Sequence, residues 1–261
     1  MDDTLLARMK EAMAHAATEK TPSTRKVRQR RLWYSAVAAV AALLIFVFWP
    51  WNKGPMLVQT GIGEQKTIAL PDGSIVTMNA VSELKIETAE WSDVRQITLH
   101  GEAFFDVLKN SDVPFYVITT NGKVTVLGTS FSVFDREKTF EVACYRGLVK
   151  AESSGILMEI PETRKIASSG NGNWLNSEVN EGDTPPWTKG QSAFSNAPLT
   201  VVIAELERQY GIHVESKVAI DQQFTGAFPN KNLNAALEII CEILQLKYKE
   251  NDSKNILLED K

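Results

Sequence analysis

An uncharged block of 21 residues, positions 32–52, constrains this chain more than any other feature. At a helical rise of about 1.5 Å per residue, its length matches the roughly 30 Å hydrocarbon core of a bilayer. Aromatic residues stand near both ends, Trp33 and Tyr34 at its start and Trp49 and Trp51 at its close. Such amphipathic rings favour the headgroup level of a membrane. The block therefore predicts a single transmembrane helix.

Charge is divided unevenly by this block. Residues 1–31 hold eight basic and four acidic side chains, whereas residues 53–261 hold 20 basic and 28 acidic ones. Five of the basic residues lie in 25–31, directly before the block. Because basic flanks stay on the cytoplasmic side, we expect a bacterial inner-membrane protein with its N-terminus in the cytoplasm and its C-terminus in the periplasm. This position explains the basic run without direct binding of nucleic acid.

A cleavable signal peptide is the strongest alternative to a membrane anchor. However, 31 residues make a long n-region, and the exit at Phe48, Trp49 and Trp51 is too bulky for a small-residue cleavage site. A buried globular helix would rarely stay uncharged over the whole block. A retained anchor is therefore the prediction.

The cytoplasmic segment, residues 1–31, contains one expected helix. Residues 2–20 repeat apolar side chains at three- and four-residue steps, which is the spacing of an amphipathic helix. An isolated helix of this length is marginal in water, so its apolar face is expected to lie on the membrane or to dock onto a partner. A solvated, fraying tail is the alternative. The residues of this face are Leu5, Leu6, Met9 and Met13.

The chain beyond the block divides by its periodicity. Residues 53–168 carry short alternating runs separated by turn signals, and they predict an all-β periplasmic domain: a sandwich, a roll or a short β-solenoid. Residues 169–190 are rich in Gly, Asn and Pro and predict a linker. Residues 191–261 predict a small α+β domain in which helices and strands alternate as a tandem βαβ unit.

The expected elements follow from these patterns. In the all-β domain the strands are expected at 66–70, 75–78, 84–87, 94–99, 103–108, 115–119, 124–127, 131–134 and 140–143. In the α+β domain the helices are expected at 199–210 and 233–244, with strands at 212–215, 224–228, 246–249 and 255–258.

The survey for catalytic chemistry is negative in most respects. His15, His100 and His213 fall in different segments, and none stands at metal-ligand spacing from another His or Cys. The best acid pair is Glu102 and Asp106, which on one face of a strand would lie about 13 Å apart. That separation is too long for a retaining glycosidase, so both are expected to be structural. We expect no enzyme, no cofactor and no metal site.

The chain has two cysteines, Cys144 and Cys241. Each lies in an apolar run, and they fall in different expected domains. We therefore expect both thiols to be buried and free rather than joined in a disulfide.

Ordered motifs cover much of the all-β domain. The clearest are Leu70–Ser74, Leu99–Val107 and Val126–Val133. In order and spacing they resemble the FecR family of anti-sigma factors and sigma regulators, over about residues 56–170. The motif residues, expected to be structural, are Asp72, Gly73, Ser74, Asn79, Gly101, Glu102, Phe105, Asp106, Val107, Pro114, Phe115, Leu127, Gly128, Thr129, Phe131 and Gly147.

Backbone conformation explains several of these residues. Asp72 and Gly73 suit a tight turn, in which a positive φ is tolerated. Gly101 and Gly128 would permit a bulge or a close approach of another backbone.

The tail, from about residue 187, carries a second resemblance. It is similar to the C-terminal domain of Bacteroidetes-type FecR members, which is itself like the secretin/TonB short N-terminal domain. The residues that carry it are Trp187, Phe194, Asn196, Pro198, Leu199, Glu207, Arg208, Tyr210, Phe224, Thr225 and Gly226.

The resemblance implies a transmembrane signal relay. In this family the cytoplasmic N-terminus holds an extracytoplasmic-function sigma factor, and the periplasmic domain senses the signalling domain of a TonB-dependent outer-membrane transporter. Regulatory proteases then act on the sensor. Here the cytoplasmic segment is short, so sigma binding would rest on the single face Leu5, Leu6, Met9 and Met13, docked in a groove. The alternatives are loss of sigma binding and a role as an accessory sensor.

One alternative belongs to a different functional class. The chain could be a membrane-anchored periplasmic protein that binds glycan or cell wall, with an inert cytoplasmic tail. This would require Trp91, Trp174 and Trp187 to form an exposed aromatic platform.

Overall fold

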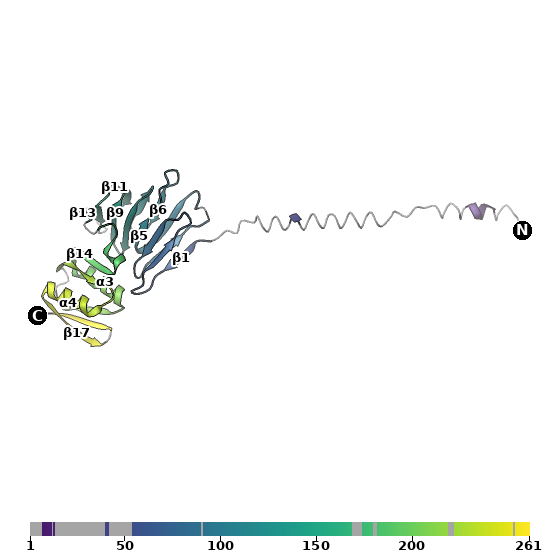
Figure 1. Cartoon of the computed structure of the whole chain (residues 1–261). Helices are drawn as coiled ribbons and strands as arrows, with labels where there is room; N and C mark the ends of the chain where they lie inside the picture. Colours follow the sequence, from purple (N-terminus) through teal and green to yellow (C-terminus); the bar gives the residue numbers. More distant parts are fainter. Residues whose placement is uncertain are drawn as a thin grey trace. The chain divides into compact units, whose positions relative to one another are not determined.

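The computed structural model describes residues 7–11, 13, 40–41, 54–89, 91–168, 174–179, 182–218, 222–252 and 254–261. The chain forms two compact units, Met1–Asn52 and Lys53–Lys261, and each is described by itself. The labelled strands and helices all belong to the second unit (Figure 1).

The first unit contributes a short helical piece to the described residues. Residues 7–11 are helical, as is Met13. The side chains of Met9 and Met13 are 54% and 68% exposed, so both are open to a partner. Leu5 and Leu6, the other members of the predicted apolar face, lie outside the described residues.

The predicted membrane span, 32–52, also lies outside the described residues, apart from the helical positions 40 and 41. Within the described part of the chain, no helix combines the length and the apolarity needed to cross a membrane. The span and its topology therefore stay predictions from the sequence.

Thirteen strands of the second unit pair into one sheet. The main path through it runs β11-β10-β7-β6-β5-β8-β9-β12-β13, while β3 and β4 also pair with β5 and carry β2 and β1 outside them. The strands are β1 (Met56–Gln59), β2 (Lys66–Ala69), β3 (Ile75–Met78), β4 (Glu83–Ile86), β5 (Arg95–Asp106), β6 (Phe115–Ile118), β7 (Lys123–Val126), β8 (Ser130–Arg136), β9 (Thr139–Arg146), β10 (Leu148–Ser153), β11 (Ile156–Pro161), β12 (Arg164–Ser168) and β13 (Trp174–Glu178).

Strand β5 organises this sheet because it changes partners midway. Its first half pairs with β4 and, in parallel, with β6, whereas its second half pairs with β3 and β8. The change falls at Gly101, where φ is +114°. A Cβ built there would lie 2.5 Å from Ser82 Oγ, so only glycine fits. The sequence predicted two strands, 94–99 and 103–108, where the structure has one bent strand.

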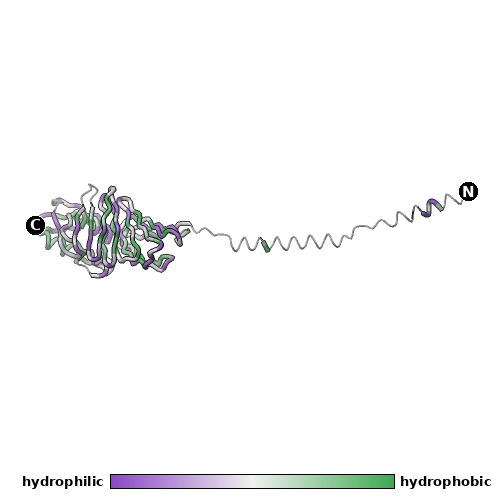
Figure 2. The backbone as a smooth tube through the Cα atoms, turned by 90° about the horizontal axis from the view of Figure 1, so that it is seen from above, coloured by the Kyte–Doolittle hydropathy of each residue, from purple (hydrophilic) through white to green (hydrophobic). Residues whose placement is uncertain are grey.

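The bend brings the two ends of β5 together. Arg95 Nη1 donates to the Leu108 carbonyl at 3.0 Å, although an unbent strand over those residues would span about 40 Å. The sheet therefore curves back on itself as a half-barrel around one core. Figure 2 shows hydrophobic and hydrophilic stretches intermixed throughout the second unit. Along β5, buried residues alternate with less buried ones, as expected when one face of a strand is buried. Among the options that the sequence left open, none described this shape.

A buried arginine holds the ends of β5 in place. Arg95 is only 2% exposed. Its guanidinium bonds the Asp72 carboxylate at 3.0 Å and the carbonyls of Leu108, Val113 and Asn110 at 2.8–3.3 Å. Such charge-assisted bonds are stronger than neutral ones and compensate the burial of the charge. The turn at Asp72 and the connection from β5 to β6 are thus fixed to one side chain.

We expect Arg95→Lys to lower the free energy of unfolding of 53–261 by about 2–4 kcal/mol, because a lysine reproduces the charge but not the fork of donors. Urea denaturation would measure it. The matched control is Arg146→Lys, since Arg146 pairs with Asp106 on the exposed surface; it should cost less than about 1 kcal/mol. Equal and small losses of unfolding free energy in both variants would contradict this role of Arg95.

The C-terminal part of the second unit has its own core. In Figure 1 its helices and strands gather at one end of the curved sheet. Two of its strands pair as β14-β16, and three as β15-β18-β17. Its elements are β14 (Gln191–Pro198), α3 (Leu199–Tyr210), β15 (His213–Ser216), β16 (Gln223–Pro229), α4 (Leu233–Leu244), β17 (Leu246–Asp252) and β18 (Asn255–Asp260).

The predicted helices of this part are confirmed, but the βαβ interpretation needs correction. The strands before and after α3 lie in different sheets, and so do the strands before and after α4. Neither α3 nor α4 is therefore a crossover between two strands of one sheet. The parallel pair that does occur joins β15 to β18. The alternation of periods in the sequence identified the elements, but it carries no information on which sheet each strand joins.

The stretch predicted as a linker, 169–190, contains regular structure. Strand β13 pairs with β12, and Trp174 packs against the core edge-on to Phe140, with 6.2 Å between ring centroids. A 3-10 helix, η1, spans Pro186–Lys189. Four of the five residues of β13 are exposed, so the strand has no alternating pattern for sequence reasoning to find.

Both cysteines are buried and free, as predicted. Burial raises the pKa of the Cys144 thiol to about 11 and also raises the pKa of Cys241. Each thiol is therefore protonated and unreactive at neutral pH.

Candidate functional site

The residues that join the curved sheet to the C-terminal part form a chain of hydrogen bonds. Asn79 Nδ2, just after β3, donates to Glu102 Oε2 on β5 at 2.7 Å. On its other side Asn79 Oδ1 accepts from Gln209 Nε2 on α3 at 3.1 Å. The same Gln209 Nε2 donates to Glu205 Oε1 at 2.7 Å. We call these four residues the junction chain; it links a strand of the sheet to a helix of the C-terminal part.

Glu205 is the best-supported member of the junction chain. It is 5% exposed and accepts bonds from three further atoms besides Gln209. Arg208 Nε and Nη2 donate to its Oε2 at 3.0 and 2.8 Å, and Ser192 Oγ donates to its Oε1 at 3.1 Å. A buried carboxylate is stabilised when several donors and a cation surround it. Glu205 therefore joins Gln209, Arg208 and Ser192 at one point of the junction.

Backbone contacts add to this junction. The Gly63 N–H donates to the Arg208 carbonyl at 3.0 Å, and Gln65 Nε2 donates to the Trp187 carbonyl at 2.7 Å. A Cβ at Gly63 would lie 2.6 Å from the carbonyl oxygen of Gln209, so the loop before β2 fits closely against α3. The sheet and the C-terminal part thus meet over several independent contacts.

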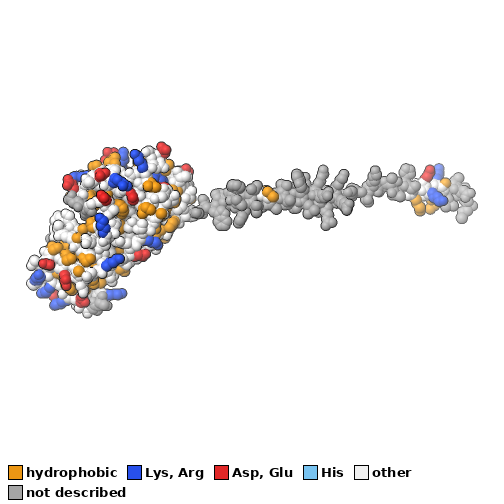
Figure 3. Space-filling view, viewed as in Figure 1, with side chains coloured by type: hydrophobic (Ala, Val, Ile, Leu, Met, Phe, Trp, Pro, Cys, Tyr) orange, Lys and Arg blue, Asp and Glu red, His pale blue; other side chains and the backbone are white. Residues whose placement is uncertain are grey.

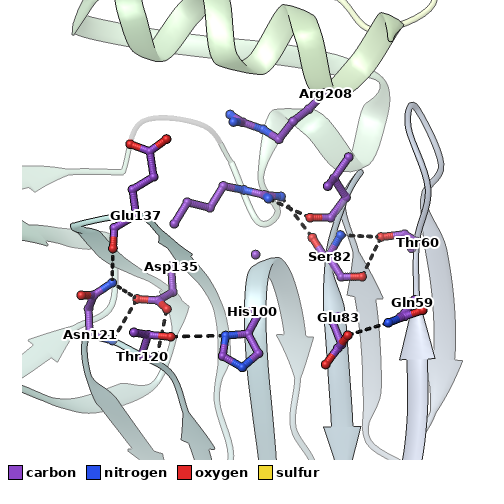
Figure 4. Close-up of a pocket in the computed structure, with 13 residues that line it drawn as sticks. Gln59, Thr60, Ser82, Glu83, His100, Thr120, Asn121, Asp135, Glu137 and Arg208 are labelled. Carbon is purple, nitrogen blue, oxygen red and sulfur yellow. Dashed lines mark hydrogen bonds between the residues drawn. The ribbon is translucent and has the colours of Figure 1, made fainter.

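A pocket of about 620 Å³ opens beside the junction (Figure 4). Arg136 lines it and donates to the carbonyls of Val81 and Ala80, both at 2.7 Å. Arg208, on α3, also lines the pocket and lies above it in Figure 4. Burial, and next the charge of Arg208, lower the pKa of Arg136. The pocket also holds His100, whose Nδ1 bonds Thr120 Oγ1 at 3.3 Å.

Two further cavities lie at the junction. A cavity of about 180 Å³ lies between Phe134 of the sheet and Phe194 of β14, with Glu102, Glu205 and Arg208 among its lining residues. A third, of about 790 Å³, is lined by amide and threonine side chains from both sides, together with Lys189 and Lys231. Within the described residues, no group of three or more His, Cys, Asp or Glu could hold a metal ion.

Glu102 is the electrostatically unusual residue of the junction chain. Burial, and next the negative charge of Glu205, raise the pKa of Glu102 to about 7. The hydrogen bond from Asn79 and the charge of Arg136 act in the opposite direction. At neutral pH this carboxyl is therefore close to half protonated, and its charge is sensitive to anything that moves Glu205.

The predicted motif residues fall into three groups in the structure. Asn79, Gly101 and Glu102 lie at the junction. Four apolar ones lie in the core, where the rings of Phe105 and Phe131 stack with centroids 5.0 Å apart. The core group is Phe105, Val107, Phe115 and Phe131. The remaining ones lie at the opposite end of the strands.

At that opposite end the motif residues shape turns. Ser74 N and Oγ donate to the Asp72 carboxylate at 3.0 and 2.9 Å, and Gly73 adopts the expected positive φ of 85°. A Cβ at Gly128 would lie 2.4 Å from Lys109 Cα, which confirms the expected close approach. Two further hydrogen bonds lie there: Ser130 Oγ donates to Asp106 at 2.7 Å, and Thr129 Oγ1 donates to the Leu148 carbonyl at 3.0 Å.

The last three motif residues lie at the same end of the strands. Gly147 has a φ of +95°, Pro114 is half-buried, and Leu127 is 45% exposed.

Glu102 and Asp106 do not form an acid pair. Glu102 bonds Asn79 at the junction, whereas Asp106 bonds Ser130 and Arg146 toward the far end of β5. Their partners differ, and so do their surroundings. The interpretation of Glu102 as a residue of the fold alone misses its place in the junction chain.

Sequence reasoning missed Arg95, Arg136, Glu205 and Gln209. A signal for two of them was present, because Glu205 and Gln209 stand four residues apart on α3, directly beside the apolar positions Val202 and Leu206. Polar residues at that spacing share a helix face. Their burial indicates a polar contact between two bodies rather than a solvated surface.

Comparison with known proteins agrees with this geometry. A family model described as FecR protein matches residues 56–150, and one described as FecR, C-terminal matches residues 192–258. The chain belongs to the FecR family. The two matched regions lie within the two bodies that the junction chain connects. No match was found among the curated proteins.

Solved structures extend the FecR assignment over both bodies. Two crystal structures of a candidate anti-sigma factor from Parabacteroides distasonis ATCC 8503, at 2.50 and 1.65 Å resolution, are similar to this chain. Each is 29% identical in sequence with a TM-score of 0.73. The likeness covers 79% of this chain and 99% of that one. The likeness spans both bodies, so the same two-body plan occurs in that candidate anti-sigma factor.

We expect Glu102→Gln to make 53–261 more stable at pH 8 by up to about 3 kcal/mol, and to change little at pH 4. The folded-state pKa of Glu102, about 7, exceeds its ordinary value of 4.5. Its stabilising contribution is therefore complete below about pH 4.5 and is lost as the pH rises through 7. Glutamine keeps an acceptor for Asn79 without the charge.

Thermal unfolding of wild type and variant across this pH range would measure the difference. The control is Glu215→Gln, which removes an exposed carboxylate on β15. A difference between Glu102→Gln and wild type that stayed constant from pH 4 to pH 8 would contradict the proton-linked behaviour of Glu102.

Proposed function

We propose that this chain is a transmembrane anti-sigma factor or sigma regulator. It relays a signal from a TonB-dependent outer-membrane transporter to an extracytoplasmic-function sigma factor. The observation that carries the proposal is the presence of both FecR regions in one chain, in the order seen across nearly the whole of a candidate anti-sigma factor.

The cytoplasmic end of the relay is the predicted helix 2–20. Met9 and Met13 are helical, four residues apart and exposed, as a groove-docking face requires. Methionine suits such a face because its flexible side chain adapts to the partner's pocket. Leu5 and Leu6 complete the face in the sequence. The sigma factor would therefore be held by a few apolar contacts, which a modest signal can break.

The periplasmic end of the relay is the second unit. A signalling domain of the transporter would bind it, and regulatory proteases would act after that encounter. The junction chain supports this role, because binding at the C-terminal part can reach the sheet through Gln209 and Asn79. The chain would work at the inner membrane, with these contacts on the periplasmic side.

The alternative of a glycan-binding protein lacks its required platform. Trp91 and Trp187 are 7% and 6% exposed, and Trp174 packs against the core. Trp91 meets Phe115 edge-on at 6.0 Å between centroids. These rings are parts of the fold, so no aromatic surface of the kind that this alternative needs is formed by them.

Residues 1–31 fused to a soluble carrier should capture one sigma factor from the cytosol of the native host, identified by mass spectrometry. Met9→Asp should reduce the capture at least about tenfold, because it would place a charge in an apolar groove. Ala7→Asp, on the opposite side of the predicted helix, should leave it unchanged. Capture of no sigma factor, or equal capture by both variants, would sink the groove-docking mode.

A further inference from the structure

Three exposed leucines form a row at the end of the sheet away from the junction. Leu108, Leu127 and Leu148 are 54%, 45% and 45% exposed. They stand on the outward side of the chain, where the alternation of a half-buried sheet usually places polar residues. The neighbour of each on the inward side is buried: Val107, Val126 and Val149.

The pairing register shows that the three leucines are neighbours. Strands β7 and β10 pair Thr125 with Lys150, and two further steps in that register bring Leu127 opposite Leu148. Leu108 lies beside them, because the Asn110 N–H donates to the Leu127 carbonyl at 2.7 Å. We call these three residues the leucine row.

The same end of the sheet receives the chain from the first unit. Thr88 Oγ1 donates to the carbonyl of Gly54, the residue where the described chain of the second unit begins, at 3.1 Å. From there the register runs through β4 and β5 to β6 and β7 and ends at the leucine row. Along this line Val94 is also apolar and 38% exposed. Gly54 and the leucine row therefore terminate the same set of strands.

The length of the connecting chain limits the distance between Gly54 and the predicted span. The predicted span closes at residue 52, and the two residues from there to Gly54 reach about 7 Å at most. On the proposed topology, Gly54 is thus held close to the headgroups. Lys109, which follows Leu108 and is exposed, suits the phosphates found there.

We propose that the leucine row is a membrane-contact edge, which lies on the periplasmic surface of the membrane that the chain spans. This rests on the proposed topology. The contact would set the strands upright and hold the junction and the C-terminal part away from the bilayer, open to a periplasmic partner. The exposed leucines gain burial in the interface, which offsets part of the orientational freedom that the sheet loses.

The test uses the full chain in nanodiscs of phosphatidylcholine, with a fluorophore at Leu127→Cys and quenching spin labels on the lipid headgroups. The native Cys144 and Cys241 are buried. Treating the wild-type chain with the same fluorophore checks that neither of them is labelled. The matched control is Leu157→Cys, a 63% exposed leucine on β11 in the same sheet but toward the junction end. We expect quenching by about half or more at position 127 and far less at position 157.

Three outcomes would overturn the proposal. Equal quenching at both positions would mean that the sheet has no preferred end on the membrane. Position 127 shielded from water but unquenched would mean that protein covers the leucine row instead. Failure of the chain to enter nanodiscs, read separately by size exclusion, would refute the span itself along with the contact edge. Loss of quenching at position 127 on adding Leu108→Gln and Leu148→Gln is the expected confirmation.

Discussion

The bend of β5 at Gly101 is the constraint on which the rest of this structure depends. One twelve-residue strand serves both halves of the sheet, and it can do so only if its backbone turns sharply where the partners change. A positive φ and the 2.5 Å approach of Ser82 Oγ to the Cβ position leave glycine as the one residue that fits. At the other end of the half-barrel, Arg95 bonds Asp72 and the Leu108 carbonyl and so holds the two ends of β5 together. The bend at Gly101 and these bonds of Arg95 together fix the shape of the strand.

The junction is a consequence of that bend. Ser82 Oγ accepts from the Glu102 N–H at 3.0 Å, so the residue after the pivot is held in register with the loop that carries Asn79. The carboxyl group of Glu102 therefore lies near α3, where the negative charge of Glu205 raises its pKa. A polar contact with a carboxyl near its pKa is less costly to open than an apolar core, and this suits a protein whose two bodies must respond to a partner. The strength of the contact would change with the protonation of Glu102.

Sequence reasoning recovered local structure better than it recovered long-range pairing. The helices 199–210 and 233–244 follow from strong apolar periodicity and end at residues in the left-handed conformation, Gly211 and Gln245. Strand β13 was not predicted because its side chains show no alternation of buried and exposed positions. Strand β5 was predicted as two strands because its bend depends on a single glycine, Gly101. The junction depends on contacts between residues 130 positions apart, such as Gln209 with Asn79, and no local pattern encodes such a pair. The motif residues were found, but the resemblance alone did not distinguish those at the junction from those of the core.

The central claim is that the two FecR bodies act as one regulator through the junction chain. The most direct measurement is genome-wide transcription in the native host, comparing deletion of the chain with a chromosomal Gln209→Ala variant, which removes the shared amide between Asn79 and Glu205. The account predicts that the set of genes altered by the deletion is also altered by Gln209→Ala, at an unchanged amount of the protein in the membrane. Wild-type transcription in the Gln209→Ala strain would contradict it.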